Sequence, residues 1–329
     1  MDKIVKFNSS QLQTSLKDFK KAQIKEFTLQ DQAILSSRGK LLRFLGLFEQ
    51  YAPETLLTLP VDASILDMDV CKACSKLFCT LEIPLSGVSR NGAFLFDKKF
   101  YSKRANMLNT LGLIFGFDIE FSVTAGDSVK LFMERLDFAL SLYPNHIDFP
   151  ALEGDDIKIQ PKVSATYSAN DIQRSKEIAF ACSTFYSAGR AVTWFLAVLA
   201  PLKLSPSKFF ADFAEWQRTN NCSIKSGWNY NEASHQEIER MQIEFLQFKY
   251  EEKNKSQLFE LVSNIVRLNG AMARCYGEGE ESVVELNYNP DELLSYSAMN
   301  VQSFFENAFM ENSHVKVFMG SDGVEYHYC

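Results

Sequence analysis

The sequence predicts a mainly α protein: a multi-helix globular chain around one long buried central helix, with one or two small β-hairpins. Three observations favour this fold. Gly and Pro are scarce, at 15 and 9 of 329 residues, which is unusual for a fold built on many tight turns. Apolar residues recur at three- and four-residue spacings in most segments. One of these segments, residues 170–204, is both the longest and the most apolar.

Residues 170–204 are predicted to form the central helix. Their apolar side chains cover most of the helix circumference, which is typical of a helix buried inside a domain or a membrane. A membrane span is excluded because Arg190 and Pro201 interrupt the ~20 apolar residues that it needs. The small side chains that end at Gly189 allow a neighbouring helix to approach closely, or mark a kink. We therefore expect this helix to form the core.

Capping residues and turn signals predict the remaining elements. Asn91–Gly92 lies between apolar runs and predicts a type I′ hairpin over residues 83–96. The alternating tail, residues 314–329, predicts a terminal hairpin, and the run 118–123 predicts a short strand. A first helix is expected at residues 12–22, after a cap at Ser9 or Ser10, and another begins at residue 62 or 67 and runs to residue 81. A last helix begins at Asn289–Pro290. Further helices are expected at residues 31–51, 97–115, 127–143, 205–219, 231–252 and 256–276.

The chain is long enough for two domains. We predict an N-terminal helical domain with the small hairpin at residues 1–143 and a C-terminal helical domain with the terminal hairpin at residues 170–329. Residues 144–169 are predicted to be a linker, because they contain three prolines, a glycine and Asp155–Asp156 but few large apolar side chains.

The net charge of -7 is unevenly distributed. Residues 1–50 contain nine Lys or Arg against five acidic residues, whereas residues 229–329 contain seven against seventeen. Such a division favours head-to-tail attraction between copies of the chain or a basic face for an anionic partner, although charges often only solvate helix surfaces. The first ten residues lack a signal peptide, and the seven cysteines form no disulfide pattern. We therefore expect a cytoplasmic protein, or a virion protein made in the host cytoplasm.

No motif for a metal, a cofactor or a catalytic triad is recognisable. Cys71-x-x-Cys74 with Cys79 lacks a second pair of ligands. We therefore expect these cysteines to be buried thiols of the core and not zinc ligands. The four histidines lie in no known signature, and His146 is expected to be an exposed loop residue. The glycine-rich segment 277–281 is acidic and follows a helix, whereas a phosphate-binding loop precedes one. The sequence therefore predicts no catalytic residue, no metal and no cofactor.

A basic and aromatic segment gives the best signal for a partner. Four cations with two aromatic rings between residues 98 and 104 can contact phosphates and stack on unpaired bases, unless they are only the exposed face of a helix. Lysines near the N-terminus add to this charge. The predicted nucleic-acid-binding residues are Lys98, Lys99, Tyr101, Lys103, Arg104, Lys20, Lys21 and Lys25.

The favoured function is a non-enzymatic, self-assembling structural protein that packages RNA as a capsid or nucleocapsid subunit. Its expected partners are copies of itself and RNA, and no membrane. The first alternative is a cytosolic enzyme without a short sequence signature, built on carboxylates around residues 118–156. The second is a helical adaptor that binds one protein partner.

Overall fold

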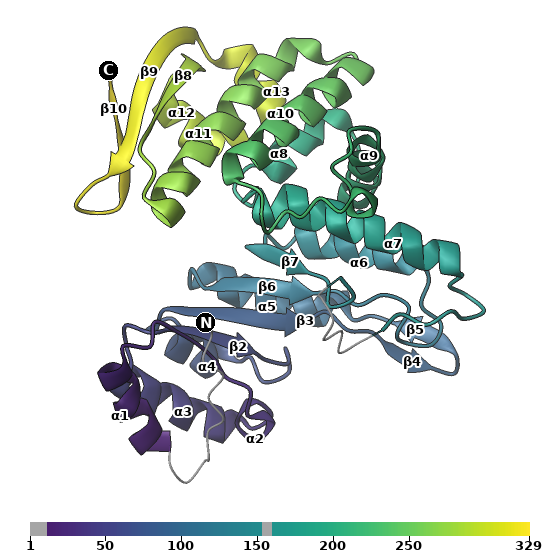
Figure 1. Ribbon diagram of the computed structural model, residues 1–329, viewed down its shortest axis with the longest axis vertical. Helices are drawn as coiled ribbons and strands as arrows, with labels where there is room; N and C mark the ends of the chain where they lie inside the picture. Colours follow the sequence, from purple (N-terminus) through teal and green to yellow (C-terminus); the bar gives the residue numbers. More distant parts are fainter. Residues whose placement is uncertain (1–11, 153–159) are drawn as a thin grey trace. The chain divides into compact units, whose positions relative to one another are not determined.

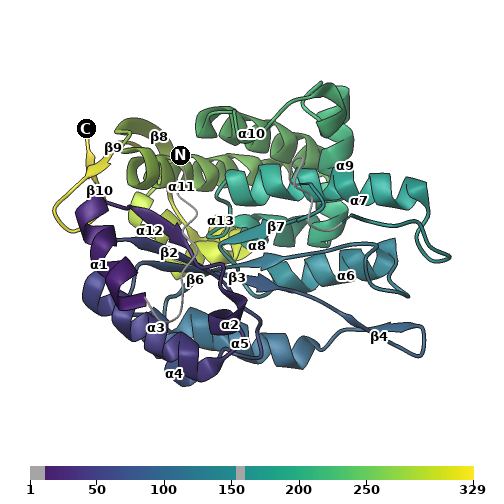
Figure 2. The same ribbon diagram turned by 60° about the horizontal axis from the view of Figure 1, so that its bottom comes forward.

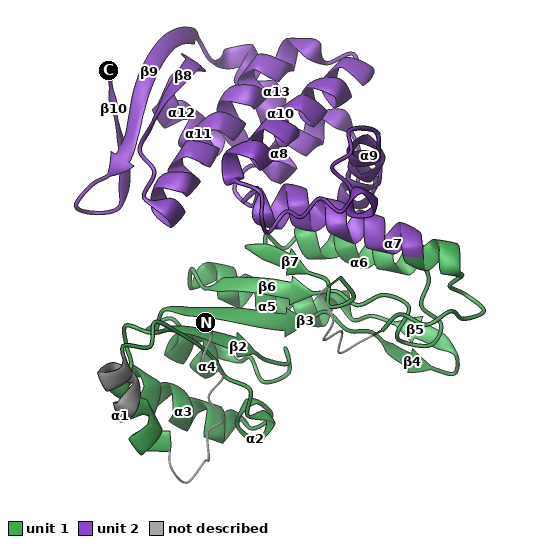
Figure 3. Ribbon diagram, viewed as in Figure 1, with its two compact units in different colours: residues 1–172 green, residues 173–329 purple. Residues whose placement is uncertain are grey.

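A computed structural model describes residues 12–152 and 160–329, without the side chains of residues 18–22. The predicted cap at Ser9 or Ser10, the first ten residues and Asp155–Asp156 lie outside the described residues. The chain forms two compact units, residues 1–172 and 173–329 (Figure 3). Their boundary falls inside one helix, α7 (Ala169–Cys182).

Unit 1 is an α/β unit, and the predicted mainly α fold is wrong. Its centre is a five-stranded parallel sheet in the order β1-β2-β3-β6-β7 (Figure 1). The segment predicted to be a linker contributes the last of these strands. The strands are β1 (Glu26–Thr28), β2 (Leu56–Pro60), β3 (Cys79–Pro84), β6 (Ile114–Asp118) and β7 (His146–Asp148).

Helices connect consecutive strands of this sheet. They are α2 (Gln32–Leu35), α3 (Arg38–Tyr51), α4 (Met68–Cys74), α5 (Lys98–Thr110) and α6 (Val129–Leu140), while α1 (Leu12–Ala22) precedes the first strand. Because the strands follow one another in chain order, right-handed crossovers place their connecting helices on one face. Figure 2 shows α3, α4 and α5 on the same side of the sheet. α6 lies beside α5, because the Phe96 and Phe138 rings are 5.4 Å apart and Asn109 donates a hydrogen bond to the Leu142 carbonyl.

The two faces of the sheet differ in chemistry because strand residues alternate in direction. Fully buried side chains such as Leu59, Leu81, Phe117 and Ile147 face the helix layer. The residues between them face the other way and are mostly polar. We call this second surface the polar face; it carries Thr58, Thr80, Glu82, Gly116, Asp118, His146 and Asp148.

Several local predictions for unit 1 are confirmed. Strands β4 (Val88–Arg90) and β5 (Ala93–Leu95) form the predicted hairpin, and Asn91 and Gly92 have φ angles of 52° and 76°, as a type I′ turn requires. The side chains of Asp67, Asp97 and Ser128 accept hydrogen bonds from the first turns of α4, α5 and α6. The sequence predicts a strand at residues 118–123, but β6 spans Ile114–Asp118 and overlaps this prediction only at Asp118.

Unit 2 is helical with a small antiparallel sheet. The sheet has the order β10-β9-β8, and β9 and β10 form the predicted terminal hairpin. The helices expected to begin at residue 205 and at Asn289–Pro290 are confirmed, and the side chains of Ser205 and Asn289 cap them. Its elements are α8 (Phe195–Leu199), α9 (Pro206–Thr219), α10 (His235–Glu252), α11 (Phe259–Glu278), β8 (Ser282–Tyr288), α12 (Pro290–Leu294), α13 (Val301–Asn307), β9 (Met310–Met319) and β10 (Val324–Tyr328).

The predicted central helix is not one helix. After α7 the chain continues as a π-helix over Ser183–Ala188, turns at Gly189 and Arg190, and resumes as α8. Arg190 has a φ angle of 49°, which a helix does not allow. The segment is nevertheless buried as predicted: the Phe185 ring lies 5.0 Å from that of Phe209 and 5.2 Å from that of Phe213. In the part of the chain that the structure describes, no helix has the length and apolar character needed to cross a membrane.

Candidate functional site

The candidate site lies on the polar face of unit 1, across β3, β6 and β7, and extends to the carboxyl ends of β6 and β7 at Asp118 and Asp148. The strand register brings Glu82, Gly116 and His146 into one row, and Asp118 and Asp148 into the next. The carboxyl ends of parallel strands are where α/β enzymes place their active sites, since the loops that bind substrate follow there. The sequence positions are far apart, so only the sheet brings these groups together.

His146 is the centre of the site. Its Nε2 atom lies 2.8 Å from Oε2 of Glu82 and 3.2 Å from Oδ2 of Asp148. Glu82 is two strands away, and the intervening strand contributes Gly116. A Cβ atom on Gly116 would lie 2.0 Å from His146 Nε2, so a larger residue cannot occupy this position without displacing the ring. Glycine at this position therefore lets the imidazole lie across β6 and reach Glu82.

The site is rich in negative charge and partly open to solvent. The side chains of His146, Glu82 and Asp148 are 22%, 20% and 39% exposed. Burial lowers the pKa of His146, but the hydrogen bond and charge of Glu82, with the charges of Asp148 and Asp118, outweigh it and raise the pKa above its ordinary value of 6.5. The three carboxylates around one imidazole thus favour a bound positive charge.

This arrangement suits two kinds of chemistry. A protonated imidazole between carboxylates can donate a proton to a reacting group, and carboxylates can accept one. The same imidazole nitrogen and carboxylate oxygens are also ligands for a divalent cation. Among the described residues, Glu82, His146 and Asp148 are the one group of three His, Cys, Asp or Glu side chains whose ligand atoms all lie within 4.8 Å of one another.

A buried ion pair holds the loops beside the site. Both carboxylate oxygens of Asp127 accept hydrogen bonds from Arg135, at 2.9 and 3.0 Å, and the two side chains are only 3% and 4% exposed. Arg135 also donates to the Glu120 carbonyl, and its guanidinium lies 4.4 Å from the Phe94 ring centre. These contacts connect the loop after β6 and the β4–β5 hairpin to α6. Burial raises the pKa of the Glu120 carboxyl, which lines a cavity here of about 10 Å³.

The residues predicted to bind nucleic acid lie mostly on α5. Lys98, Lys99 and Lys103 are exposed. Tyr101 is buried, and its hydroxyl donates to the Pro84 carbonyl; Arg104 donates to the Ala63 carbonyl and stacks on a neighbouring ring. In α1, the side chains of Lys20 and Lys21 lie outside the described residues, and Lys25 is exposed just before β1. Binding of nucleic acid by these residues stays a prediction.

The predicted core thiols are buried. Cys71 and Cys74 lie in α4 and Cys79 in β3, and all three are free thiols. Burial raises the pKa of Cys71 to about 11, so this thiol is not a reactive nucleophile at neutral pH.

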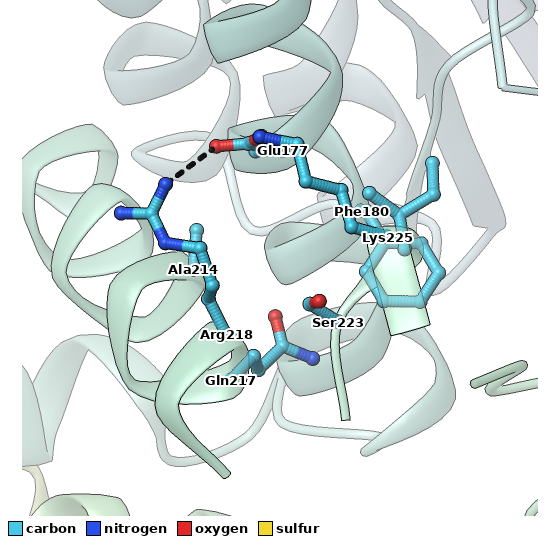
Figure 4. Close-up of a pocket in the computed structure, with 8 residues that line it drawn as sticks. Glu177, Phe180, Ala214, Gln217, Arg218, Ser223 and Lys225 are labelled. Atoms are coloured by element: carbon cyan, nitrogen blue, oxygen red, sulfur yellow. Dashed lines mark ion pairs between the residues drawn. The ribbon is translucent and has the colours of Figure 1, made fainter. Parts of the chain in front are cut away.

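Unit 2 contains a second small cavity, between α7, α9 and the loop before α10 (Figure 4). Glu177 forms ion pairs with Arg218 and Lys225 at its edge, and Gln217 lies at its base. Its volume of about 10 Å³ holds roughly one water molecule and no substrate. This cavity is therefore not a candidate for a substrate site.

Sequence reasoning missed this site. The sequence predicts His146 in an exposed loop, because the three-residue strand β7 falls in the segment expected to be a linker. Glu82 was not recognised either, although it alternates with the apolar Leu81 and Ile83 in a pattern typical of a strand. The signal that remained was the enzyme alternative with carboxylates around residues 118–156, a range that includes Asp118 and Asp148.

No family model and no curated protein matches the sequence. Solved structures that resemble the chain include two of the radical S-adenosylmethionine methyltransferase TsrM from Kitasatospora setae, one with cobalamin and a 4Fe–4S cluster and one with tryptophan and an S-adenosylmethionine analogue. Identity is 9% in both, and the TM-scores are 0.38 and 0.37. The matches cover 43% of this chain and 28% or 30% of the methyltransferase, so no activity or cofactor is inferred from them.

The interpretation as a non-enzymatic capsid or nucleocapsid subunit is wrong. It depended on a mainly α fold, which the parallel sheet of unit 1 contradicts. The site on the polar face agrees instead with the enzyme alternative. Self-association and RNA binding stay predictions from the sequence.

Proposed function

We propose that this protein is an enzyme whose active site is the polar face of unit 1 across β3, β6 and β7. One observation carries the proposal: Glu82 on β3 and His146 and Asp148 on β7 converge across β6, toward the end of the sheet where α/β enzymes bind their substrates. Their side chains are partly exposed, so a substrate can reach them. The chemistry that such groups support is polar catalysis on a small molecule, in which protons or a polarised oxygen take part.

The strand geometry favours function over simple stabilisation. Ion pairs add little net stability at the surface, and for partly buried pairs the loss of hydration offsets much of the attraction, so a fold gains little from this pair. The glycine at position 116 removes a side chain from the middle of a strand, which weakens a strand. A locally unfavourable residue that permits a polar contact is typical of a site kept for its chemistry.

The proposal can be tested with a mixture of natural small molecules in place of a chosen substrate. The purified protein is incubated with a small-molecule extract of cells, and mass spectrometry records which compounds are consumed or formed. The same experiment is done with His146→Ala and with His314→Ala, because His314 lies 3.9 Å from Glu285 in an exposed pair on the sheet of unit 2. We expect a substrate that is consumed by the wild type and His314→Ala and spared by His146→Ala. Identical profiles for the wild type and His146→Ala would contradict the proposal.

A further inference from the structure

We propose that Glu82, His146 and Asp148 bind one divalent transition-metal ion. The inference rests on the proposed function, because it names the group through which that active site would work. One imidazole nitrogen with two carboxylate oxygens suits Zn²⁺, Mn²⁺ or Fe²⁺ better than Mg²⁺ or Ca²⁺, which prefer oxygen ligands throughout.

The distances between the three ligand atoms fit a shared ion. Bonds from such an ion to nitrogen and oxygen are about 2.0–2.2 Å long, so neighbouring ligands at near-tetrahedral or octahedral angles are roughly 3.0–3.5 Å apart. His146 Nε2 lies 2.8 Å from the Glu82 oxygen and 3.2 Å from the Asp148 oxygen. All three atoms lie within 4.8 Å of one another. Small side-chain rotations would therefore complete the coordination, without movement of the strands.

An ion would satisfy these groups better than a proton does. A protonated Nε2 has a single N–H, whereas two carboxylate oxygens lie within hydrogen-bond distance of this atom. One proton can be donated fully to only one of them. A divalent cation bonds to all three atoms at once and balances both carboxylate charges. Asp118, the Cα partner of Asp148 on β6, adds a further negative charge on the same face.

The backbone arrangement supports a preformed site. Glu82 and His146 come from strands on either side of β6, and the bare backbone of Gly116 leaves room for their side chains to meet above it. Strands hold ligands more rigidly than loops do. Three protein ligands with partial solvent exposure leave further coordination positions open, which is the pattern of catalytic rather than structural metal sites.

The test measures metal binding directly on the full chain. The protein is stripped with EDTA, and binding of ZnCl₂ and MnCl₂ is followed by isothermal titration calorimetry, with elemental analysis after gel filtration. We expect one tight equivalent in the wild type and in His314→Ala, and at least a tenfold loss of affinity in His146→Ala and Asp148→Asn. Far-UV circular dichroism checks that each variant is folded. No stoichiometric binding in the wild type, or unchanged affinity in both site variants, would overturn the proposal.

The two proposals can fail separately. In one outcome, the wild type binds stoichiometric metal that His146→Ala loses, while the metabolite profiles do not depend on His146. That result would support the metal site and contradict the proposed enzyme. Turnover that depends on His146 in a protein that binds no metal would leave the enzyme and remove the metal site.

Discussion

At the scale of single residues, the site depends on the absence of a side chain at Gly116. Leu81 and Phe115 are ordinary core residues of apolar segments. Gly116 is different, because its role is visible only once the His146 ring is placed over it. A sequence shows a glycine in an apolar run, and the usual interpretation is a bend or a turn.

Replacing Gly116 with Ala should separate His146 from Glu82. Without the hydrogen bond and charge of Glu82, burial would dominate, and the pKa of His146 in the metal-free protein should fall from its raised value. Histidine NMR titration measures this directly. The matched control is Gly46→Ala in α3, where an added Cβ has no neighbour within 4 Å. An unchanged His146 pKa in Gly116→Ala would mean that the Glu82 contact is not what raises it.

A second histidine predicts how unit 2 responds to acid. His235 begins α10 and is 9% exposed, with its Nδ1 atom 3.3 Å from Nη1 of Arg274. Burial, followed by the charges of Arg190 and Arg274, lowers its pKa from 6.5 to about 4, although Glu278 acts in the opposite direction. Arg274 is itself paired with Glu239. Protonating the folded protein therefore places a third positive charge in this buried cluster.

The sign of the pH effect follows from the lowered pKa. Unfolded chains take up the proton near pH 6.5 and folded chains only near pH 4, so the stability that neutral His235 contributes is complete above pH 6.5. It is lost as the pH falls toward 4, by up to about 1.4 kcal/mol per pH unit for one proton. Denaturant melts between pH 7 and pH 4 measure it. His235→Gln should flatten this dependence and His314→Gln should not; equal curves for the wild type and His235→Gln would exclude His235 as the cause.

At the scale of elements, sequence signals located ends and turns better than strands. The caps at Ser128 and Ser205 and the turn at Asn91–Gly92 were predictable, because one side chain or backbone preference determines each. Strands β2 and β3 were missed: residues 79–81 were expected to end a helix, and Pro60 and Pro84 are residues more typical of turns than of strands. Val61 and Leu85, one residue further on, donate hydrogen bonds to the next strand. The backbone nitrogen of each proline therefore faces the strand before it in the sheet. The pairing with that strand has already ended there, so the missing N–H removes no hydrogen bond between strands.

The π-helix after α7 gives an element-scale prediction. Nε2 of Gln242 donates hydrogen bonds to the carbonyls of Phe185, at 2.7 Å, and Gly189, at 3.0 Å, which the irregular turn leaves available. Gln242 is 1% exposed, so Gln242→Ala should leave buried carbonyls unpaired and cost about 1–3 kcal/mol in denaturant melts. Gln247→Ala, which removes an exposed amide on the same helix, should change stability by less than about 0.5 kcal/mol. Equal effects of the two substitutions would show that Gln242 does not support the turn.

At the scale of the whole molecule, the sequence misled because strand residues are few. The strands of the parallel sheet contain three to six residues each, whereas the helices between them give long periodic patterns. Composition therefore indicated helices correctly and concealed the sheet that organises unit 1. The site could not be predicted, because it requires the strand order: Glu82 and His146 are 64 residues apart and meet only when β3, β6 and β7 lie side by side.

Metal binding should stabilise unit 1 selectively. A ligand that binds only the folded state adds about 2.7 kcal/mol when present at 100 times its Kd. Hydrogen exchange measured by mass spectrometry should therefore slow in peptides that contain β3, β6 and β7 when Zn²⁺ is added. Peptides from α10 and β9 in unit 2 serve as the internal control and should exchange at unchanged rates. Protection confined to unit 2 would place the ion elsewhere.

Anomalous X-ray diffraction from crystals of the full chain grown with Mn²⁺ or Zn²⁺ tests most directly whether the polar face is the functional centre. We predict one strong anomalous peak within about 2.0–2.3 Å of His146 Nε2 and of carboxylate oxygens from Glu82 and Asp148. The same crystals of His146→Ala should lack it. A peak at another cluster, with none between these three side chains, would contradict the account.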